Sequence, residues 1–449
     1  MVIEIKGRRI PDVDYFDRVR IQLKDGTILE GVILPKPETS REDIVIVKLP
    51  NGYNVGISID KIENIEVVEK ATLKSETIPI GQFVKEEKAT LPRVRLVATG
   101  GTIMSKVDYV TGAVYPSFSL EDLYALYPEL RGVASLELLN LMAIFSEDFT
   151  PETWSKIAET AYKAFLDGVT GVVILHGTDT MHYTAAALAF ALRNAPGPVA
   201  LVGSQRSSDR PSSDAFENLF SAVLTCVKAP FAESVVVMHY TTNDGVIAVH
   251  RGTKVRKMHT SRRDAFISIN AEPIAYVYPQ KMELEVRTER YIPRGTVDSM
   301  ILENKFDTRV ALVKFFPGMD PEIIHFLIDK GYHGIVIEGT GFGHVRKELL
   351  DPIRRAIENE IPVVIASQTI FGRVNLNVYR RGVELLKIGV IPAEDMHPET
   401  AFVKLCWVLG KTRDLKEVRR LMLTPIAFEI NPRTEPHHYI QRLELEKVQ

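Results

Sequence analysis

Residues 94–102 have the sequence VRLVATGGT, an apolar strand followed at once by a glycine turn that ends in a threonine. Two glycines allow a tight turn at the carboxyl end of a parallel strand, where ligands bind in open α/β folds. We therefore expect Thr102 to face a crevice. The alternative is an ordinary turn whose hydroxyl only caps the loop. A Walker phosphate loop is not indicated, because no Gly-Lys-Ser/Thr follows.

Similar apolar strands recur after residue 93. They are Leu136 to Ile144, Val172 to Leu175, Val199 to Val202 and Ser234 to Met238. Strands of this kind are buried on both faces, so we predict a mostly parallel sheet. Thr150 as N-cap, Pro151 at the first helical position and Gly168 at the end mark a helix between two of them.

A second polar motif, His176-Gly177-Thr178-Asp179-Thr180, follows the strand Val172 to Leu175 and precedes a helical stretch, Thr184 to Leu192. Both motifs should therefore meet at one sheet edge. Thr178 and Asp179 would lie at a helix N-terminus, which favours developing negative charge. Threonine and aspartate are also routine N-caps, but a second threonine at a neighbouring strand end strengthens the interpretation as a site.

The chain divides into three parts with two connections. Short strands separated by turns predict a small β-barrel over 1–85, and a charged stretch broken by proline and glycine makes 86–92 a linker. An α/β domain follows over 93–285, then a connection over 286–308 and a smaller α/β domain over 309–440. The barrel is slightly acidic, which favours a docking module over an RNA-binding one.

The composition excludes several classes of protein. The 449 residues carry 55 basic and 58 acidic side chains, a formal charge of -3, which argues against a surface built to neutralise phosphates. No apolar run reaches the roughly 18 residues of a membrane span, and Glu4 and Lys6 do not suit a signal peptide. We expect a soluble, cytoplasmic protein.

Cysteine and histidine usage predicts no metal. Cys226 and Cys406 are isolated, so neither a disulfide framework nor a zinc knuckle is indicated. The histidines form no close ligand pair of the HExxH kind, and His437 and His438 lie in a polar tail.

A threonine nucleophile needs a base, because its hydroxyl is scarcely ionised at neutral pH. The sequence offers no GxSxG elbow and no Ser-His-Asp order. A partly buried lysine held by a carboxylate is the available alternative, and composition alone does not choose that lysine.

The two motifs together resemble the paired motifs of the bacterial-type L-asparaginase/glutaminase family, over about 93–440. The segment Arg256 to Ser261 also resembles the family's lysine segment. The resemblance implies that Thr102 is the nucleophile and that Thr178, Asp179 and Lys257 support it, with Lys254 as the alternative lysine. Asp179 would orient Lys257, which exchanges a proton with Thr178.

The resemblance also implies a tyrosine on a mobile loop, residues 104–118. Tyr115 has the best spacing, and Tyr109 stays open as the alternative. A family segment that grips the amino-acid end of the substrate matches Ser146 and Asp148. Glu147 stands between them where the family often has glutamine, which adds a negative charge.

A small barrel before an asparaginase-like region resembles the D-type subunits of archaeal-type glutamyl-tRNA(Gln) amidotransferase. The implied fold is a barrel, an asparaginase-like parallel-sheet domain and a smaller C-terminal α/β domain. The implied activity is glutamine hydrolysis that supplies ammonia to an E-type subunit, which binds Glu-tRNA(Gln) and uses ATP and Mg. This chain would need no cofactor, and a homodimer would give a heterotetramer. The alternatives are a free-standing L-asparaginase/glutaminase and an inactive docking protein.

Overall fold

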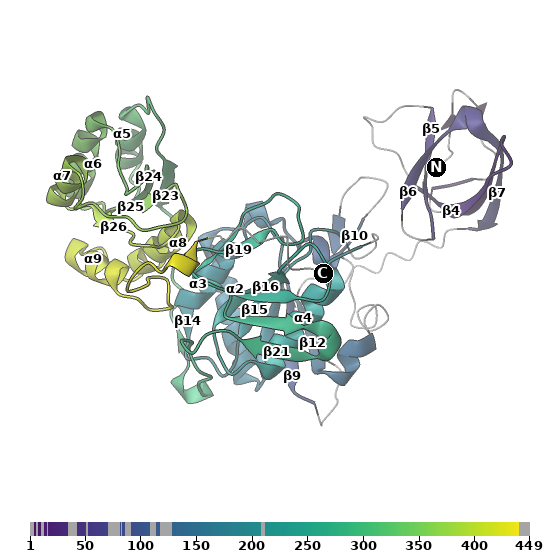
Figure 1. Cartoon of the computed structure of the whole chain (residues 1–449), viewed down its shortest axis with the longest axis horizontal. Coiled ribbons are helices and arrows are strands. Elements are labelled where there is room, and N and C mark those ends of the chain that lie inside the picture. Colours follow the sequence, from purple (N-terminus) through teal and green to yellow (C-terminus); the bar gives the residue numbers. More distant parts are fainter. Residues whose placement is uncertain are drawn as a thin grey trace.

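The computed structural model describes residues 4–5, 8–9, 13–15, 17–34, 43–50, 53–70, 81, 83–85, 91–107, 114–116, 128–207 and 212–439. Their larger sheets have five, nine and four strands. Figure 1 labels strands from each of these sheets. Two short strands, β1 (Glu4–Ile5) and β2 (Arg8–Arg9), form a separate antiparallel pair near the N-terminus. No helix among the described residues is long and apolar enough to cross a bilayer.

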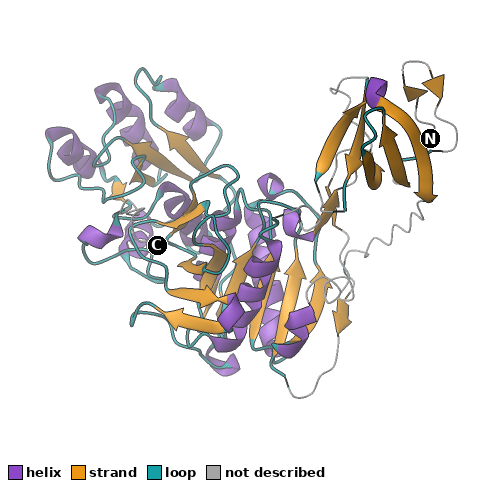
Figure 2. Ribbon diagram, turned by 45° about the vertical axis from the view of Figure 1, so that its right-hand side comes forward, coloured by secondary structure: helices purple, strands orange, loops and turns teal. Residues whose placement is uncertain are grey.

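The N-terminal sheet is antiparallel, with the order β6-β5-β4-β3-β7, and it curls into a small barrel (Figure 2). Its strands are β3 (Arg18–Leu23), β4 (Ile28–Leu34), β5 (Ile44–Lys48), β6 (Asn54–Ser58) and β7 (Ile62–Glu69). Alternate residues of the strands fill one core, which includes Val19, Ile21, Ile33, Val45, Val47 and Ile57. The sequence predicts four of these strands, over 19–23, 28–34, 44–49 and 54–59. β7 was missed because none of its side chains is fully buried.

One predicted boundary is wrong. Residues Phe83–Lys85, expected at the end of the barrel, form strand β8 and pair antiparallel with β12 (Ser135–Asn140) of the central sheet. The backbone N–H of Gly81 also donates to the carbonyl of Asn140, at 2.7 Å. The central domain therefore recruits the end of the segment that had been assigned to the barrel. The other domain boundaries stay predictions.

The nine-stranded sheet has the order β21-β20-β17-β16-β15-β13-β9-β12-β8. Its five middle strands are parallel, as expected: β12, β9 (Arg93–Ala98), β13 (Gly171–Leu175), β15 (Val199–Val202) and β16 (Ser234–His239). The predicted strand from Leu136 ends at Asn140 instead of Ile144. The flanking strands pair antiparallel, so the sheet is mixed rather than mostly parallel. Besides β8 they are β17 (Ile247–Arg251), β20 (Ala275–Tyr278) and β21 (Glu283–Val286).

Helices cover both faces of this sheet (Figure 2). On β9, Val94 and Leu96 face the core that α4 (Ala215–Lys228) covers, and Val97 faces the core that α2 (Pro151–Leu166) and α3 (Met181–Ala191) cover. Burial on both faces explains why the middle strands are continuously apolar. Thr150 caps α2 at its start, as predicted.

The smaller C-terminal domain has a parallel sheet of β23 (Val310–Lys314), β24 (Gly334–Gly339), β25 (Val363–Ser367) and β26 (Ile391–Pro392). Its helices are α5 (Glu322–Asp329), α6 (Leu350–Glu358), α7 (Arg380–Ile388), α8 (Pro398–Leu409) and α9 (Leu415–Leu423). Helix α8 packs against α3, so a shared core joins the two α/β domains. Within the predicted connection 286–308, β22 (Ile301–Leu302) pairs with β14 (Leu192–Arg193).

A buried ion pair holds the tail of the chain against α8. Lys404 Nζ lies 2.5 Å from Glu429 Oε1, and both side chains are fully buried. The ammonium also donates to the carbonyls of Met422 and Thr424, and the carboxylate accepts the N–H of Ala427.

Replacing Glu429 with glutamine would leave the buried ammonium of Lys404 without its countercharge. We expect Glu429→Gln to lower the free energy of unfolding by about 3–5 kcal/mol, measured by denaturant unfolding. The control is Glu417→Gln, which removes a carboxylate from the exposed Arg420 pair and should change little. Equal effects of the two substitutions would contradict the proposed role of the buried pair.

Candidate active site

The two glycine motifs touch through their backbones. At Gly101, φ is +88°, and an added Cβ would lie 2.5 Å from the nitrogen of Gly177. At Gly100, φ is +122°, and an added Cβ would lie 2.2 Å from the carbonyl oxygen of Ile144. A side chain at either position would push the loops apart. The glycines therefore allow the segments after β9, β12 and β13 to meet at one edge, as predicted from the sequence.

Thr99 fixes the first motif to the end of β13. Its backbone N–H and its hydroxyl both donate to the carbonyl of Leu175, at 3.1 Å and 2.8 Å. Thr102 follows at the start of a single 3-10 turn, Thr102–Met104, and is partly buried. The hydroxyl of Thr99 is thus used for structure, which leaves Thr102 as the candidate nucleophile of this motif.

The second motif is fixed from two sides. The Thr180 hydroxyl donates to the carbonyl of Ser146, at 2.6 Å, and an added Cβ on Gly177 would lie 2.8 Å from the Cβ of Ser146. An added Cβ on Gly203, after β15, would lie 2.8 Å from the Cγ2 of Thr178. Helix α3 begins at Met181 with Thr180 as its N-cap residue, so Thr178 and Asp179 lie just ahead of the helix.

Lys257 joins this motif through its ammonium. The Nζ atom donates to the hydroxyl oxygen of Thr178 at 2.8 Å and to Oδ1 of Asp179 at 2.7 Å. The lysine side chain is 8% exposed, whereas that of Asp179 is 69% exposed. A hydroxyl, an amine and a carboxylate in one hydrogen-bonded chain can pass a proton to and from the hydroxyl. The predicted association of Thr178, Asp179 and Lys257 is present.

The alternative lysine, Lys254, lies elsewhere. Its Nζ atom pairs with Oδ2 of Asp395 at 2.8 Å, and both side chains are buried. Burial lowers the pKa of Lys254 from its usual value, and the carboxylate of Asp395 opposes that shift. Lys254 therefore belongs to the contact with the C-terminal domain.

A second ion pair ties the lysine strand, β18 (Val255–Lys257), to α8. Arg256 Nε donates to Oε1 of Glu399 at 2.6 Å. The Glu399 carboxylate also lies 2.9 Å from His397 Nδ1. Burial opposes ionisation of this carboxyl group most strongly, but His397, His182 and Arg256 together lower its pKa. No local sequence pattern indicated this support, because Arg256 and Glu399 are 143 residues apart.

Contacts of both ring nitrogens hold His176 within the second motif. Its Nε2 atom lies 2.8 Å from the hydroxyl of Thr184, and its Nδ1 atom lies 2.6 Å from the carbonyl of Gly177. Burial lowers the pKa of His176 to about 4, so the ring is neutral at pH 7.

The structure describes the turn of Ser146 to Asp148 with its side chains, but it describes only the backbone of Tyr115. Ser146 is buried at the start of a 3-10 turn, Ser146–Asp148, whereas Glu147 and Asp148 are exposed. Strand β11 (Val114–Pro116) pairs with β10 (Ser105–Val107), which places the backbone of Tyr115 opposite Lys106. The side chain of Tyr115 and all of Tyr109 lie outside the described residues, so the choice of loop tyrosine stays a prediction.

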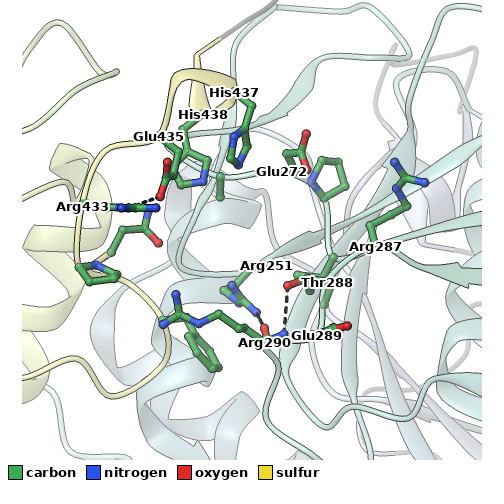
Figure 3. A pocket seen from close by; sticks show the side chains of 16 residues that line it. Arg251, Glu272, Arg287, Thr288, Glu289, Arg290, Arg433, Glu435, His437 and His438 are labelled. Atoms are coloured by element: carbon green, nitrogen blue, oxygen red, sulfur yellow. Dashed lines mark hydrogen bonds and ion pairs between the residues drawn. The ribbon is translucent and has the colours of Figure 1, made fainter.

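A pocket lies between the central sheet and the C-terminal tail, and none of the predicted site residues lines it (Figure 3). Some of the charged side chains that line the pocket already form ion pairs. Arg251 pairs with Glu233, which lies outside the pocket lining, at 2.6 Å, and Arg433 pairs with Glu435. The predicted site residues therefore lie outside this pocket.

Comparison with known proteins identifies each part of the chain. Family models match residues 13–68 (GatD N-terminal domain), 93–291 (Asparaginase, N-terminal) and 309–422 (Glutaminase/Asparaginase C-terminal domain). The thermostable L-asparaginase from Thermococcus kodakarensis has a similar structure, with a TM-score of 0.67 and 34% identity over 76% of this chain and 99% of that chain. L-asparaginase I from Vibrio cholerae is also similar, with a TM-score of 0.66 and 27% identity over 76% of this chain and 100% of that chain.

Relatives extend over the barrel as well. The D-type subunit of glutamyl-tRNA(Gln) amidotransferase from Thermofilum pendens is 52% identical, covering 95% of both chains. That of Pyrococcus furiosus is 50% identical, covering 97% of this chain and 98% of its own. The barrel, the asparaginase-like domain and the smaller domain are thus matched together in single proteins, and the chain belongs to the family of glutamyl-tRNA(Gln) amidotransferase D-type subunits.

Proposed function

We propose that this chain hydrolyses glutamine and supplies the ammonia to a partner subunit that converts Glu-tRNA(Gln) to Gln-tRNA(Gln). The observation that carries the proposal is the contact of Lys257 Nζ with both Thr178 and Asp179, beside the glycine turn that bears Thr102. The near full-length similarity to amidotransferase D-type subunits supports a coupled amidohydrolase rather than a free-standing one.

In the proposed mechanism, the hydroxyl oxygen of Thr102 attacks the carbon of the substrate's side-chain amide. The tetrahedral oxyanion would accept hydrogen bonds from backbone N–H groups near Thr178, and one such donor is typically worth about 3 kcal/mol. Collapse breaks the C–N bond, and the nitrogen leaves as ammonia after it gains the proton that the Thr102 hydroxyl loses, so an ester remains on Thr102. Water then hydrolyses the ester to release glutamate. Lys257, oriented by Asp179, exchanges protons with the Thr178 hydroxyl during the cycle.

In this proposal, the turn of Ser146, Glu147 and Asp148 binds the amino-acid end of the substrate. The loop that carries Tyr115 closes over the substrate. The exposed carboxylates of Glu147 and Asp148 suit an ammonium group. A loop that closes over the site would exclude water during attack on the amide. No metal or organic cofactor enters these steps in this chain.

The partner in this proposal is an E-type subunit that binds tRNA and uses ATP with Mg. The formal charge of -3 suits a chain that leaves phosphate binding to its partner. Two copies of each subunit would form a heterotetramer. The complex would work in the cytoplasm, where charged tRNA is used in translation.

Variants of the four catalytic candidates test the chemistry. We expect Thr102→Ala, Thr178→Ala, Asp179→Asn and Lys257→Ala each to lower the rate of glutamine hydrolysis by at least about 100-fold, measured as ammonia release. The matched controls are Thr160→Ala and Lys156→Ala on the exposed face of α2, which should retain full rates. Near-normal turnover of folded Lys257→Ala would refute its role.

The coupling to a partner is tested by measuring ammonia release with and without the E-type subunit and Glu-tRNA. We expect low activity of the isolated chain that rises when both are added, with glutamine preferred. Strong activity of the isolated chain, unchanged by the partner, would instead identify a free-standing L-asparaginase/glutaminase. Absence of activity under every condition would identify a docking protein.

A truncation tests the role of the barrel. Because β8 belongs to the central sheet, the deletion should end at residue 70 and retain residues 83–85. We expect the shortened chain to keep glutamine hydrolysis and to lose partner-dependent amidation, measured with charged tRNA. A docking role would be contradicted if the shortened chain lost glutamine hydrolysis but still amidated as much Glu-tRNA for each ammonia that it released.

A further inference from the structure

Three side chains that can bind a metal gather at the carboxyl end of β16, and none of them belongs to the cluster of Thr178, Asp179 and Lys257. They are Glu217 of α4, His239 at the end of β16 and Asp244 in the following loop. His239 Nε2 lies 3.5 Å from Glu217 Oε2 and 3.5 Å from Asp244 Oδ1. All three ligand atoms lie within 4.8 Å of one another.

The hydrogen bonds around Asn218 fix the tautomer of His239. The amide nitrogen of Asn218 donates to the carbonyl of Gly203 and to Oδ2 of Asp214, each at 3.1 Å. Its amide oxygen therefore faces the ring and accepts from His239 Nδ1 at 2.7 Å. In the neutral ring the proton is on Nδ1, so Nε2 presents a lone pair.

That lone pair lacks a hydrogen-bond partner among the described residues, although the His239 side chain is fully buried. It faces two carboxylate oxygens that are also acceptors. The separations of 3.5 Å also exceed ordinary hydrogen-bond length. Three acceptors facing one another are stabilised by a cation between them.

We infer that Glu217, His239 and Asp244 form a site for a divalent cation of the Zn²⁺ type, with water as the fourth ligand. A tetrahedral ion with bonds of about 2.0–2.1 Å holds its ligands about 3.4 Å apart. Two of the three separations match this value. The bond from Nδ1 to the amide of Asn218 is the kind of outer support that orients metal-binding histidines.

The surrounding contacts orient the two carboxylates. Glu217 Oε2 accepts the backbone N–H of Gly245 at 2.8 Å. Asp244 Oδ1 accepts from Arg263 Nη1 at 2.5 Å, and this guanidinium would share the oxygen with the ion. The Asp244 side chain is 61% exposed, so it can turn to bring its carboxylate closer to Glu217. The spacing of residues in the sequence did not indicate this cluster, because each ligand comes from a different element.

The consequence of occupancy would be structural. Arg263 also donates to the carbonyl of Ser212, so it links the loop after Lys257 to the segment before α4. An ion held by Glu217, His239 and Asp244 would fasten α4 to the end of β16 and to the loop that contacts Arg263. This inference does not depend on which amide the enzyme hydrolyses.

Co²⁺ titration of the full-length, metal-stripped chain tests the site, because tetrahedral Co²⁺ absorbs strongly in the visible range. The double variant His437→Gln/His438→Gln serves as the parent, since it removes the adjacent histidines of the tail. We expect one Co²⁺ per chain with an intense visible band that Zn²⁺ abolishes. In this parent, Asp244→Asn should weaken Co²⁺ binding by about 10-fold or more, and His239→Gln should remove the band.

The exposed position of Asp244 makes its variant informative even if His239→Gln fails to fold. Asp298→Asn, which changes another exposed aspartate, is the control and should bind Co²⁺ as the parent does. The inference is overturned if the parent shows no intense band. It is equally overturned if Asp244→Asn binds Co²⁺ with the parent's affinity.

Discussion

The close backbone contact between Gly101 and Gly177 is the constraint on which the candidate site depends. An added Cβ on Gly101 would lie 2.5 Å from a backbone nitrogen, a separation that side-chain motion cannot relieve. The positive φ at Gly100 and Gly101 adds a second reason for glycine. With these contacts the ends of β9 and β13 share one edge, and Thr102 and Thr178 belong to one region of the molecule. Without them, the sheet could form while the site could not.

The C-terminal domain contributes to the site by holding the strand of the lysine. Successive residues of an extended strand point to opposite sides, so Lys254 and Arg256 face one way and Lys257 the other. Asp395 and Glu399 bind the first two, while Thr178 and Asp179 bind the third. The ion pairs between the domains are buried more deeply than the bond from Lys257 to exposed Asp179. The position of the Lys257 amine is therefore set by contacts that substrate need not disturb.

The sequence predicted those features that local patterns encode. The five parallel strands were found because burial on both faces makes them continuously apolar. Helix α2 was found because its N-cap, its first proline and its closing glycine are local signals. The antiparallel strand β8 was missed, since three residues next to a charged stretch carry little pattern. Lys257 was separated from Lys254 only by family resemblance. In the structure the two lysines differ because Asp395 binds Lys254. Asp395 is 141 residues away from Lys254 in the sequence, so no rule of local spacing could predict this contact.

One hairpin supplies cations to two acidic groups, Asp179 and Asp244. β18 and β19 (Phe266–Ser268) pair antiparallel, and the chain between them carries Arg263. Lys257 reaches Asp179, and Arg263 reaches Asp244 at 2.5 Å. A displacement of this hairpin would lengthen both contacts together, because its two strands are hydrogen-bonded to each other. The loop after β16 that carries Asp244 is thus linked through Arg263 and this hairpin to the amine of Lys257, although no atom of that loop belongs to the proposed reaction.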